Sequence, residues 1–242
     1  MASLVDKDLD LYLEWDVVNW RRALAFLESD LQEGNGRTAL EIGGRNGGLS
    51  LLLAKYGWQV TCSDLNGPSD KALELHQTAG VTDRIDYSEL DILHPQTKER
   101  FDLVIFKSVM GGVTSRSDED RIQMVRNIHR LLEPGGKLLF IENLSGNAIH
   151  RWLRKRFVHW GNRWNYLPYV AVPGLLSDFD DVRFESFGLF GLLGRRESHR
   201  KILGRLDALL ERIVPPSWRY IIAVSAIKGL GHDRSLPMDD ND

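Results

Sequence analysis

The feature that most constrains the fold is an alternation of short apolar runs with amphipathic stretches between residues 38 and 142. The runs have the length and apolar content of buried strands, and the stretches between them carry apolar residues at helical spacing. Buried strands that alternate with helices form a parallel sheet with helices on both faces. The expected strands are Thr38–Ile42, Trp58–Ser63, Ile85–Leu90, Phe101–Phe106 and Lys137–Glu142, and the expected helices cover 48–56, 68–79 and 118–132.

Further periodic segments flank this core. A helix is expected ahead of the turn at residues 34–36, because Leu11, Trp15, Val18, Leu24, Leu27 and Leu31 recur at helical spacing. After the core come strand-like residues 182–187, a helix-like stretch at 196–213 and strand-like residues 219–228. The expected parts are a helical lead-in (1–36), a core (37–142), an insertion (143–180), a C-terminal part of the same sheet (181–229) and a disordered tail (230–242).

Composition excludes several classes of protein. The 242 residues carry 31 basic and 34 acidic side chains, and this net charge of -3 argues against a duplex nucleic-acid binder. The single cysteine, Cys62, excludes an intrachain disulfide or a cysteine-built zinc site and fits a reducing compartment such as the cytoplasm. No His and acid cluster has ligand spacing, so no metal is expected. The acidic start and the absence of a long apolar run predict a soluble or peripheral protein.

The strongest local signal is a glycine-dense turn between a strand and an apolar helix. Glu41 ends the strand, and Gly43, Gly44, Arg45, Asn46, Gly47 and Gly48 follow it. Glycines let the backbone approach a ligand closely, and the helix start aims its amides at that ligand. Taken alone, the same glycines also suit a tight turn that binds nothing.

Two carboxylates follow at the ends of the next two strands. Asp64 ends the second strand, where a carboxylate can accept both hydroxyl hydrogens of a ribose. Asp91 closes the third strand, where it can serve an adenine edge. Either acid alone is more often a turn residue or a helix cap. Together with the glycine turn, the two acids predict a nucleoside site.

Residues 37–142 resemble the class I S-adenosylmethionine-dependent methyltransferases. Glu41, Gly43 and Gly47 match the first motif of that family, whereas Arg45 stands where its middle glycine usually lies. Residues 101–108 are similar to the fourth motif, residues 131–140 to the following helix, turn and fifth strand, and residues 227–229 to the end of the sheet. The resemblance implies S-adenosyl-L-methionine as cofactor and a Rossmann-like seven-stranded, mostly parallel sheet with a reversed last strand.

The resemblance also implies roles for single residues. Asp64 matches the ribose-binding acid, Asp91 the acid that contacts the adenine amine, and Lys107 the methionine end of the cofactor site. Arg45 either tilts the turn or contacts the methionine carboxylate. The expected cofactor-binding residues are Glu41, Gly43, Gly44, Arg45, Gly47, Asp64, Leu65, Asp91, Ile92 and Lys107.

Two other functions use the same architecture. A nicotinamide-binding Rossmann protein needs glycine at positions 43, 45 and 48, and Arg45 breaks that pattern. The Leu-Glu-Pro-Gly-Gly segment at 132–136 also favours the methyltransferase interpretation. A cofactor-binding scaffold or regulator without catalysis is the second alternative, and Arg45 is the feature that favours it.

The insertion after the fifth strand is basic and aromatic. From Asn143 to Ser177 there is no acidic residue, and five cations lie among aromatic residues such as Trp152, Phe157 and Trp160. The cations are Arg151, Arg154, Lys155, Arg156 and Arg163. We interpret the insertion as a cap that recognises an anionic acceptor. A helix with a solvated basic face is the alternative, and single-stranded nucleic acid is a third and less favoured one.

Four further short segments resemble methyltransferases of bacterial surface-polysaccharide gene clusters. These segments are residues 106–112, 142–144, 160–161 and 194–197. This resemblance implies a sugar hydroxyl or another small molecule as acceptor, in a glycan or lipid-linked form that peripheral contact with the inner membrane face would reach. A hydroxyl acceptor benefits from a base. The candidates are His150 and His159 in the insertion, and Glu142 at the expected mouth of the pocket; His76 and His94 lie in polar contexts typical of the surface.

Overall fold

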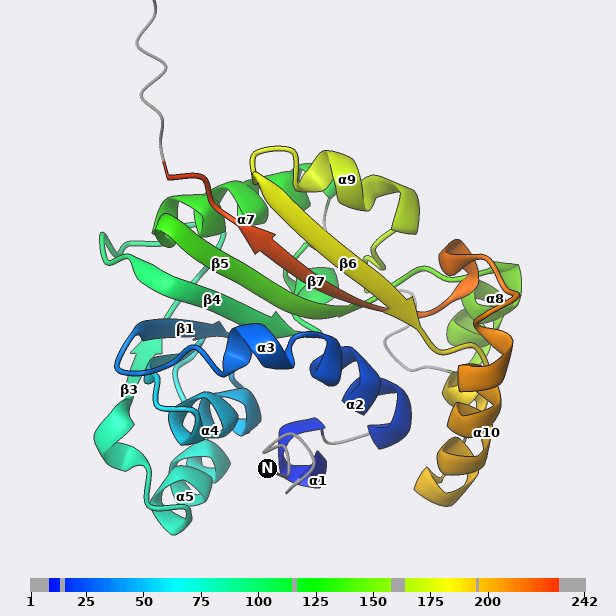
Figure 1. Cartoon of the computed structure of the whole chain (residues 1–242), viewed down its shortest axis with the longest axis horizontal. Coiled ribbons are helices and arrows are strands. Elements are labelled where there is room, and N and C mark those ends of the chain that lie inside the picture. Colours follow the sequence, from blue (N-terminus) through cyan, green and yellow to red (C-terminus); the bar gives the residue numbers. More distant parts are fainter. Residues whose placement is uncertain (1–8, 14–15, 115–116, 158–163, 195, 231–242) are drawn as a thin grey trace, which may run out of the picture.

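The computed structural model of the chain describes residues 9–13, 16–114, 117–157, 164–194 and 196–230. Seven strands form one sheet in the order β3-β2-β1-β4-β5-β7-β6 (Figure 1). The strands are β1 (Thr38–Ile42), β2 (Gln59–Asp64), β3 (Ile85–Glu89), β4 (Phe101–Lys107), β5 (Leu132–Asn143), β6 (Asp181–Phe187) and β7 (Ile221–Ile227). Only β7 runs antiparallel to its neighbours in this sheet. The expected mostly parallel, seven-stranded sheet with a reversed last strand is confirmed.

The fifth strand begins earlier than expected. Leu132 pairs with Phe101, and regular pairing resumes where Lys137 lies beside Leu103, so residues 133–136 form a bulge. Gly135 has a φ of 77° in this bulge, a conformation that favours glycine. The sequence pattern predicts a start at Lys137, because Gly135 and Gly136 interrupt the strand-like run.

Helices cover both faces of the sheet (Figure 1). One face packs against α4 (Gly48–Lys55) and α5 (Asp70–Thr78), and the other packs against α7 (Asp118–Leu131) and α9 (Val172–Leu175). Along β4, Leu103 contributes to the first core and Val104 to the second. Because both faces are buried, the strand is apolar at successive positions. The short helices η2 (Thr82–Arg84) and α6 (Met110–Val113) precede β3 and follow β4.

The described residues of the lead-in form three helices, whereas a single helix was expected. They are α1 (Leu9–Leu13), α2 (Val17–Phe26) and α3 (Glu28–Leu31). Asp16 has a left-handed φ of 45°, which a continuous helix does not allow, so α2 starts afresh after it. The lead-in packs on the same face as α4.

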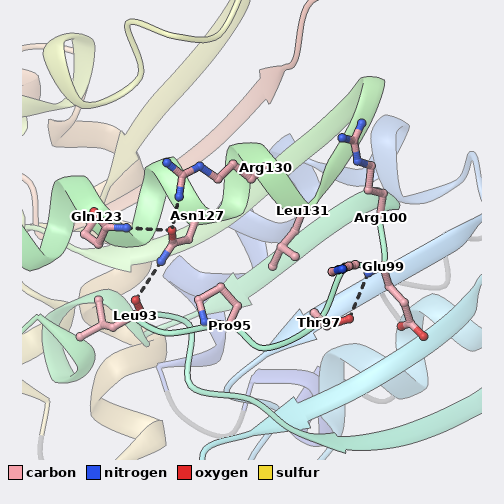
Figure 2. Close-up of a pocket in the computed structure, with 10 residues that line it drawn as sticks. Leu93, Pro95, Thr97, Glu99, Arg100, Gln123, Asn127, Arg130 and Leu131 are labelled. Atoms are coloured by element: carbon pink, nitrogen blue, oxygen red, sulfur yellow. Dashed lines mark hydrogen bonds between the residues drawn. The ribbon is translucent and has the colours of Figure 1, made fainter.

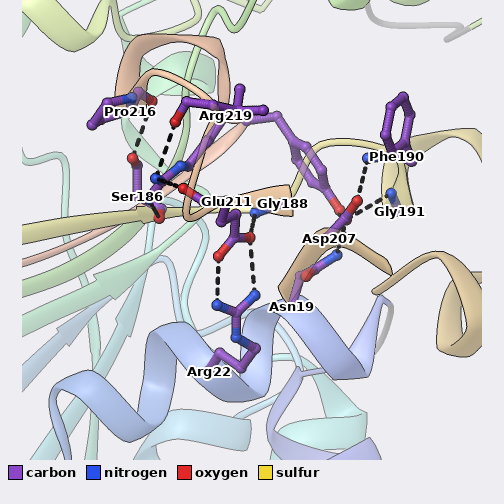
Figure 3. A network of polar contacts seen from close by, with 12 residues as sticks. Asn19, Arg22, Ser186, Gly188, Phe190, Gly191, Asp207, Glu211, Pro216 and Arg219 are labelled. Atoms are coloured by element: carbon purple, nitrogen blue, oxygen red, sulfur yellow. Dashed lines mark hydrogen bonds and ion pairs between the residues drawn. The ribbon is translucent and has the colours of Figure 1, made fainter. Parts of the chain in front are cut away.

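A polar network ties the lead-in to the C-terminal part of the chain (Figure 3). On α2, the buried Asn19 donates from Nδ2 to Asp207 Oδ2 at 3.0 Å and to the Tyr220 hydroxyl at 2.9 Å. Arg22 donates twice to Glu211, at 2.9 and 2.5 Å. Asp207 lies on α10 (Glu197–Leu210). The network therefore fixes α2 against α10 and the start of β7.

The insertion contains α8 (Ala148–Phe157), η3 (Tyr169–Ala171) and α9. A parallel bridge joins Leu144, near the start of the insertion, to Leu167. The remaining short helices are η4 (Gly191–Leu193) and η5 (Pro216–Trp218). His159 and the expected tail from residue 231 onward lie outside the described residues. Within the described ranges, no helix has the length and apolar character that a membrane crossing requires.

Candidate functional site

The glycine turn lies between β1 and α4 and contains three left-handed residues. Gly43, Arg45 and Gly47 have φ values of 68°, 45° and 76°. A Cβ on Gly43 would lie 2.5 Å from Val109 Cγ2, and one on Gly47 would lie 2.5 Å from His76 Nε2. Both positions therefore require glycine for conformation and for space, whereas Arg45 accepts a strained backbone.

Asp64 holds the glycine turn directly. Its Oδ2 accepts a hydrogen bond from the Arg45 backbone N–H at 3.0 Å, and its Oδ1 accepts one from the Leu65 N–H at 2.7 Å. Ser69 Oγ donates to the Arg45 carbonyl at 2.6 Å from the other side. The structure thus brings together the first two features that the sequence singled out. Leu65, 61% exposed, adds an apolar surface beside the carboxylate.

Glu41 supports the turn from inside the protein. Its side chain is 4% exposed, and its Oε2 accepts hydrogen bonds from the Ser50 N–H at 2.8 Å and from the Ser50 hydroxyl. Burial raises the pKa of the Glu41 carboxyl to about 7. A carboxyl in this position links the end of β1 to the first turn of α4, and its contact with the cofactor stays a prediction.

Asp91 lies near Asp64 at the same edge of the sheet. In the β2–β3 register Asp64 pairs with Glu89, the last residue of β3, so Asp91 lies two residues beyond the end of that strand. Its Oδ1 accepts from the Leu93 N–H at 2.9 Å, and its Oδ2 lies 3.1 Å from His94 Nδ1. The hydrogen bond from His94 is the main reason that the pKa of Asp91 is lowered. The side chain of Asp91 is 45% exposed, so it is ionised and accessible at neutral pH.

Lys107 lies at the end of β4 and faces the lead-in. Its Nζ donates to the Leu13 carbonyl at 3.1 Å and lies 5.8 Å from the centre of the Trp20 ring. Its charge also lowers the pKa of Glu41, against the larger effect of burial. The contact of Lys107 with a methionine carboxylate stays a prediction, and its observed contacts fix α1 near the glycine turn.

The sequence predicted Glu142 at the mouth of a pocket, but the residue is buried inside the protein. Its side chain is 0% exposed, its Oε2 accepts from the N–H groups of Val109 and Met110 at 3.0 and 2.8 Å, and its Oε1 accepts from the Asn143 N–H at 2.8 Å. Burial raises the pKa of this carboxyl to about 7. These bonds hold the loop between β4 and α6, so we assign Glu142 a positioning role.

His150 also lies inside the protein. Its ring is 3% exposed, lies 2.6 Å through Nε2 from the Leu189 carbonyl and packs edge-on against Tyr220. Burial lowers the pKa of His150, so the ring is neutral. A ring buried in this way is not open to an acceptor from solvent. A general-base role for His150 stays a prediction that requires α8 to move, and His159 lies outside the described residues.

Two further sequence interpretations need correction. His76 is buried, not at the surface: it lies 2.8 Å from the Gly47 carbonyl and 2.9 Å from the Tyr87 hydroxyl. Arg154 is 2% exposed and stacks on Tyr166, with 4.0 Å between Cζ and the ring centre. Its Nη1 donates to the Leu144 carbonyl at 2.5 Å. Arg154 therefore cannot serve as an exposed cation of the cap.

A polar pair that was not among the expected site residues lies at the ends of β4 and β5. Asn143 Nδ2 donates to Ser108 Oγ, and Ser108 has a left-handed φ of 53°. Trp164 covers the adjoining helix α6, because a Cβ on Gly111 would overlap its ring. Polar residues at strand ends were the signal that identified Asp64 and Asp91, and the same signal would have found Ser108 and Asn143. No group of three His, Cys, Asp or Glu side chains among the described residues is arranged to hold a metal ion.

The two buried carboxyls predict a pH dependence of stability. The folded-state pKa of Glu41 is raised from 4.5 to about 7, so between these pH values the folded protein keeps a proton that the unfolded chain has lost. The contribution of Glu41 to the free energy of unfolding therefore falls as pH rises from 4.5 to about 7. Glu41→Gln should flatten this fall in urea titrations at several pH values. Glu89→Gln, at an exposed strand end, is the matched control. Equal slopes in wild type and Glu41→Gln would contradict the assignment.

A match to a protein family model covers the glycine turn, Asp64 and Asp91. Residues 40–138 match a family model described as a methyltransferase domain. Aclacinomycin 10-hydroxylase of Streptomyces purpurascens is 33% identical over 119 residues, which cover 48% of this chain and 31% of that protein. A highly reducing polyketide synthase of Penicillium rubens is 30% identical over 153 residues, which cover 56% of this chain and 6% of the synthase. The chain thus spans about a third or less of the length of these curated relatives.

Solved structures share the fold at low sequence identity. Phosphoethanolamine N-methyltransferase 2 of Haemonchus contortus, in complex with S-adenosyl-L-methionine, has a TM-score of 0.62 and 18% identity over 93% of this chain and 57% of its own. The N-methyltransferase NodS of Bradyrhizobium japonicum, in complex with S-adenosyl-L-homocysteine, has a TM-score of 0.57 and 18% identity over 93% and 94%. The [4+2]-cyclase SpnF has a TM-score of 0.57 and 17% identity over 88% and 83%.

Proposed function

We propose that this chain, whose residues 40–138 match a methyltransferase domain, transfers a methyl group from S-adenosyl-L-methionine to a small-molecule acceptor. One observation carries the proposal. The Asp64 carboxylate is bonded to the glycine turn at Arg45 and lies at the same sheet edge as the exposed, ionised Asp91. Two carboxylates at the ends of neighbouring strands beside a glycine turn are suited to a nucleoside.

The residues present fit the cofactor. Each carboxylate oxygen of Asp64 accepts one hydrogen bond and retains capacity for a ribose hydroxyl. Leu65 offers an apolar surface to a flat base, and Asp91 offers its free carboxylate capacity to an amine. When bound, the cofactor supplies an electrophilic methyl group on a sulfonium. The protein then has to orient the acceptor for in-line attack and exclude water.

The test uses the whole chain with labelled cofactor. S-adenosyl-L-homocysteine should bind in titration calorimetry, and mass spectrometry should detect a mass gain of one methyl group on an acceptor. A chain that binds this ligand but methylates no member of a broad acceptor panel would favour the alternative of a scaffold without methyl transfer. The likeness to a hydroxylase and a cyclase supports keeping that alternative. Binding of NAD instead would support the nicotinamide alternative.

We further propose O-methylation of an anionic or lipid-linked glycan or other small hydroxyl acceptor, recognised by the insertion. Its helix α8 exposes Arg151, Lys155 and Arg156, and no acidic residue occurs between Asn143 and Ser177. Beside the start of α8 is a hollow of about 520 Å³, lined by Arg151 and by the exposed Ile149 and Trp218 among others. A cation beside apolar surface suits a ligand with a charged and an apolar part. A cytoplasmic location at the inner membrane face fits this proposal.

The acceptor KM is expected to rise with salt. Exposed cationic contacts weaken as ionic strength increases. Lys155→Glu together with Arg156→Glu should raise the acceptor KM further and leave the Kd of S-adenosyl-L-homocysteine unchanged. Arg126→Glu, an exposed arginine on α7, is the matched control outside the insertion. A KM that is independent of salt and of both substitutions would support the alternative that α8 is a helix with a solvated basic face.

Arg45→Gly is expected to have opposite effects on stability and on affinity. Glycine removes the strain of a left-handed φ of 45°, so the free energy of unfolding should rise by about 1 kcal/mol. Loss of the guanidinium should weaken S-adenosyl-L-homocysteine about tenfold, as expected for one charge-assisted contact with a carboxylate. Arg45→Lys keeps the charge as a control. Equal or tighter binding by Arg45→Gly would mean that the arginine is tolerated rather than used.

A further inference from the structure

A cavity of about 560 Å³ lies away from the glycine turn, between the β3–β4 connection and α7 (Figure 2). Its wall includes Leu93 and Lys98 from the connection, and Asn127 and Arg130 from the helix. Figure 2 shows Leu93 and Pro95 facing Asn127 across the two elements. None of the motifs of the proposed methyl transfer accounts for a polar cavity here.

The charge around this cavity is unbalanced. Lys98, Arg100 and Arg130 line it, and Glu99 is the only carboxylate among the lining residues. Within the described parts of the chain, none of these three cations forms an ion pair. Burial and the nearby charge of Arg100 lower the pKa of Lys228. Three unpaired cations around a hollow produce a local positive potential in a chain whose net charge is -3.

A chain of hydrogen bonds connects the cavity with Asp91. Asn127 is 2% exposed, and its Oδ1 accepts from Gln123 Nε2 at 2.8 Å and from Arg130 Nη1 at 3.4 Å (Figure 2). Its Nδ2 donates to the carbonyls of Ile92 and Leu93 at 2.9 and 3.0 Å. The Leu93 N–H donates in turn to Asp91 Oδ1.

We propose that this cavity binds a small anion with two or more phosphate or carboxylate groups, and that the anion weakens cofactor binding at Asp91. An anion that draws Arg130 toward itself removes one of the two donors that hold the Asn127 amide. The loop from Asp91 to Leu93 then loses part of its support. Anion binding stands on the cavity alone, whereas its effect on the cofactor rests on the proposed function.

The first experiment measures anion binding to the full chain by titration calorimetry, with pyrophosphate and citrate as separate probes. If only pyrophosphate binds, the cavity selects phosphate groups, and if only citrate binds, it selects carboxylates. If both bind, the cavity accepts either kind of anion. Lys98→Ala with Arg130→Ala should weaken the bound probe at least about tenfold, since charge-assisted contacts are the strong ones. Arg126→Ala, exposed on the same helix but outside the cavity, should not change it. No binding of either probe, or equal weakening by Arg126→Ala, overturns the proposal.

The second experiment measures coupling. Saturating pyrophosphate or citrate, whichever binds, should raise the Kd of S-adenosyl-L-homocysteine about fivefold, within the usual range of coupling between two sites. Gln123→Ala removes the other donor to Asn127 Oδ1, so it should change that factor, and the anion Kd of this variant is measured separately because Gln123 also lines the cavity. Unchanged cofactor affinity in the wild type overturns the coupling. If the wild type binds the anion but no S-adenosyl-L-homocysteine, the proposed function fails and the anion site stands.

Discussion

Asp64→Ala is expected to weaken the binding of S-adenosyl-L-homocysteine by about 10-fold to 100-fold, the cost of losing charge-assisted hydrogen bonds. The substitution has two effects. It removes the expected acceptor of the ribose hydroxyls, and it releases the backbone N–H of Arg45, which Asp64 holds at 3.0 Å. The glycine turn therefore loses its anchor together with the ligand contact. Titration calorimetry measures the change.

Two variants make this test specific. Asp86→Ala removes an exposed carboxylate from the opposite end of β3 and should leave affinity unchanged. Asp64→Asn keeps one oxygen that can accept from the backbone, so it should lose less affinity than Asp64→Ala while the turn stays anchored. Unchanged affinity in Asp64→Ala would remove Asp64 from the cofactor site.

Glu142→Ala is expected to lower the free energy of unfolding by about 3 kcal/mol or more, because each buried N–H left without a partner costs about 1–3 kcal/mol. The Glu142 carboxyl accepts from the buried N–H groups of Met110 and Asn143 and from the part-buried N–H of Val109. The buried Arg154 also loses a nearby negative charge. Urea unfolding at constant pH measures the change.

The controls separate hydrogen bonding from side-chain volume. Glu142→Gln keeps one acceptor oxygen for Val109 and Met110, so its loss of stability should fall between wild type and Glu142→Ala. Glu185→Ala removes an exposed carboxyl from β6 and should have little effect. A loss below about 1 kcal/mol in Glu142→Ala, the value of one ordinary hydrogen bond, would contradict the positioning role.

The parts of the site that could be predicted are those with local signals. The glycine turn and Asp64 each stand at a strand end, where backbone conformation and strand order decide their position. Their juxtaposition follows from parallel pairing of β1 with β2, which places the carboxyl ends of both strands at one edge. No contact distant in sequence has to be known for this inference.

The orientation of α8 could not be predicted in this way. Its apolar residues Ile149 and Trp152 are 65% and 60% exposed, whereas His150 and Arg154 are 3% and 2% exposed. Periodicity assigns the apolar face to the core. In the structure, partners distant in sequence decide instead: the Leu189 carbonyl meets His150, and the Tyr166 ring meets Arg154. The burial of His76 by Tyr87 has the same origin.

The position of β7 between β5 and β6 affects how the sheet can form while the chain is synthesised on the ribosome. Synthesis delivers β6 before β7, yet β6 joins the sheet only through β7, with Asp181 and Lys137 both paired to Ile227. Until residue 227 has emerged, the nascent chain presents β5 as an open edge and β6 as an unpaired strand. Open edges pair with other chains. The risk of pairing with another chain is therefore expected to be greatest in the interval between the synthesis of β6 and that of β7.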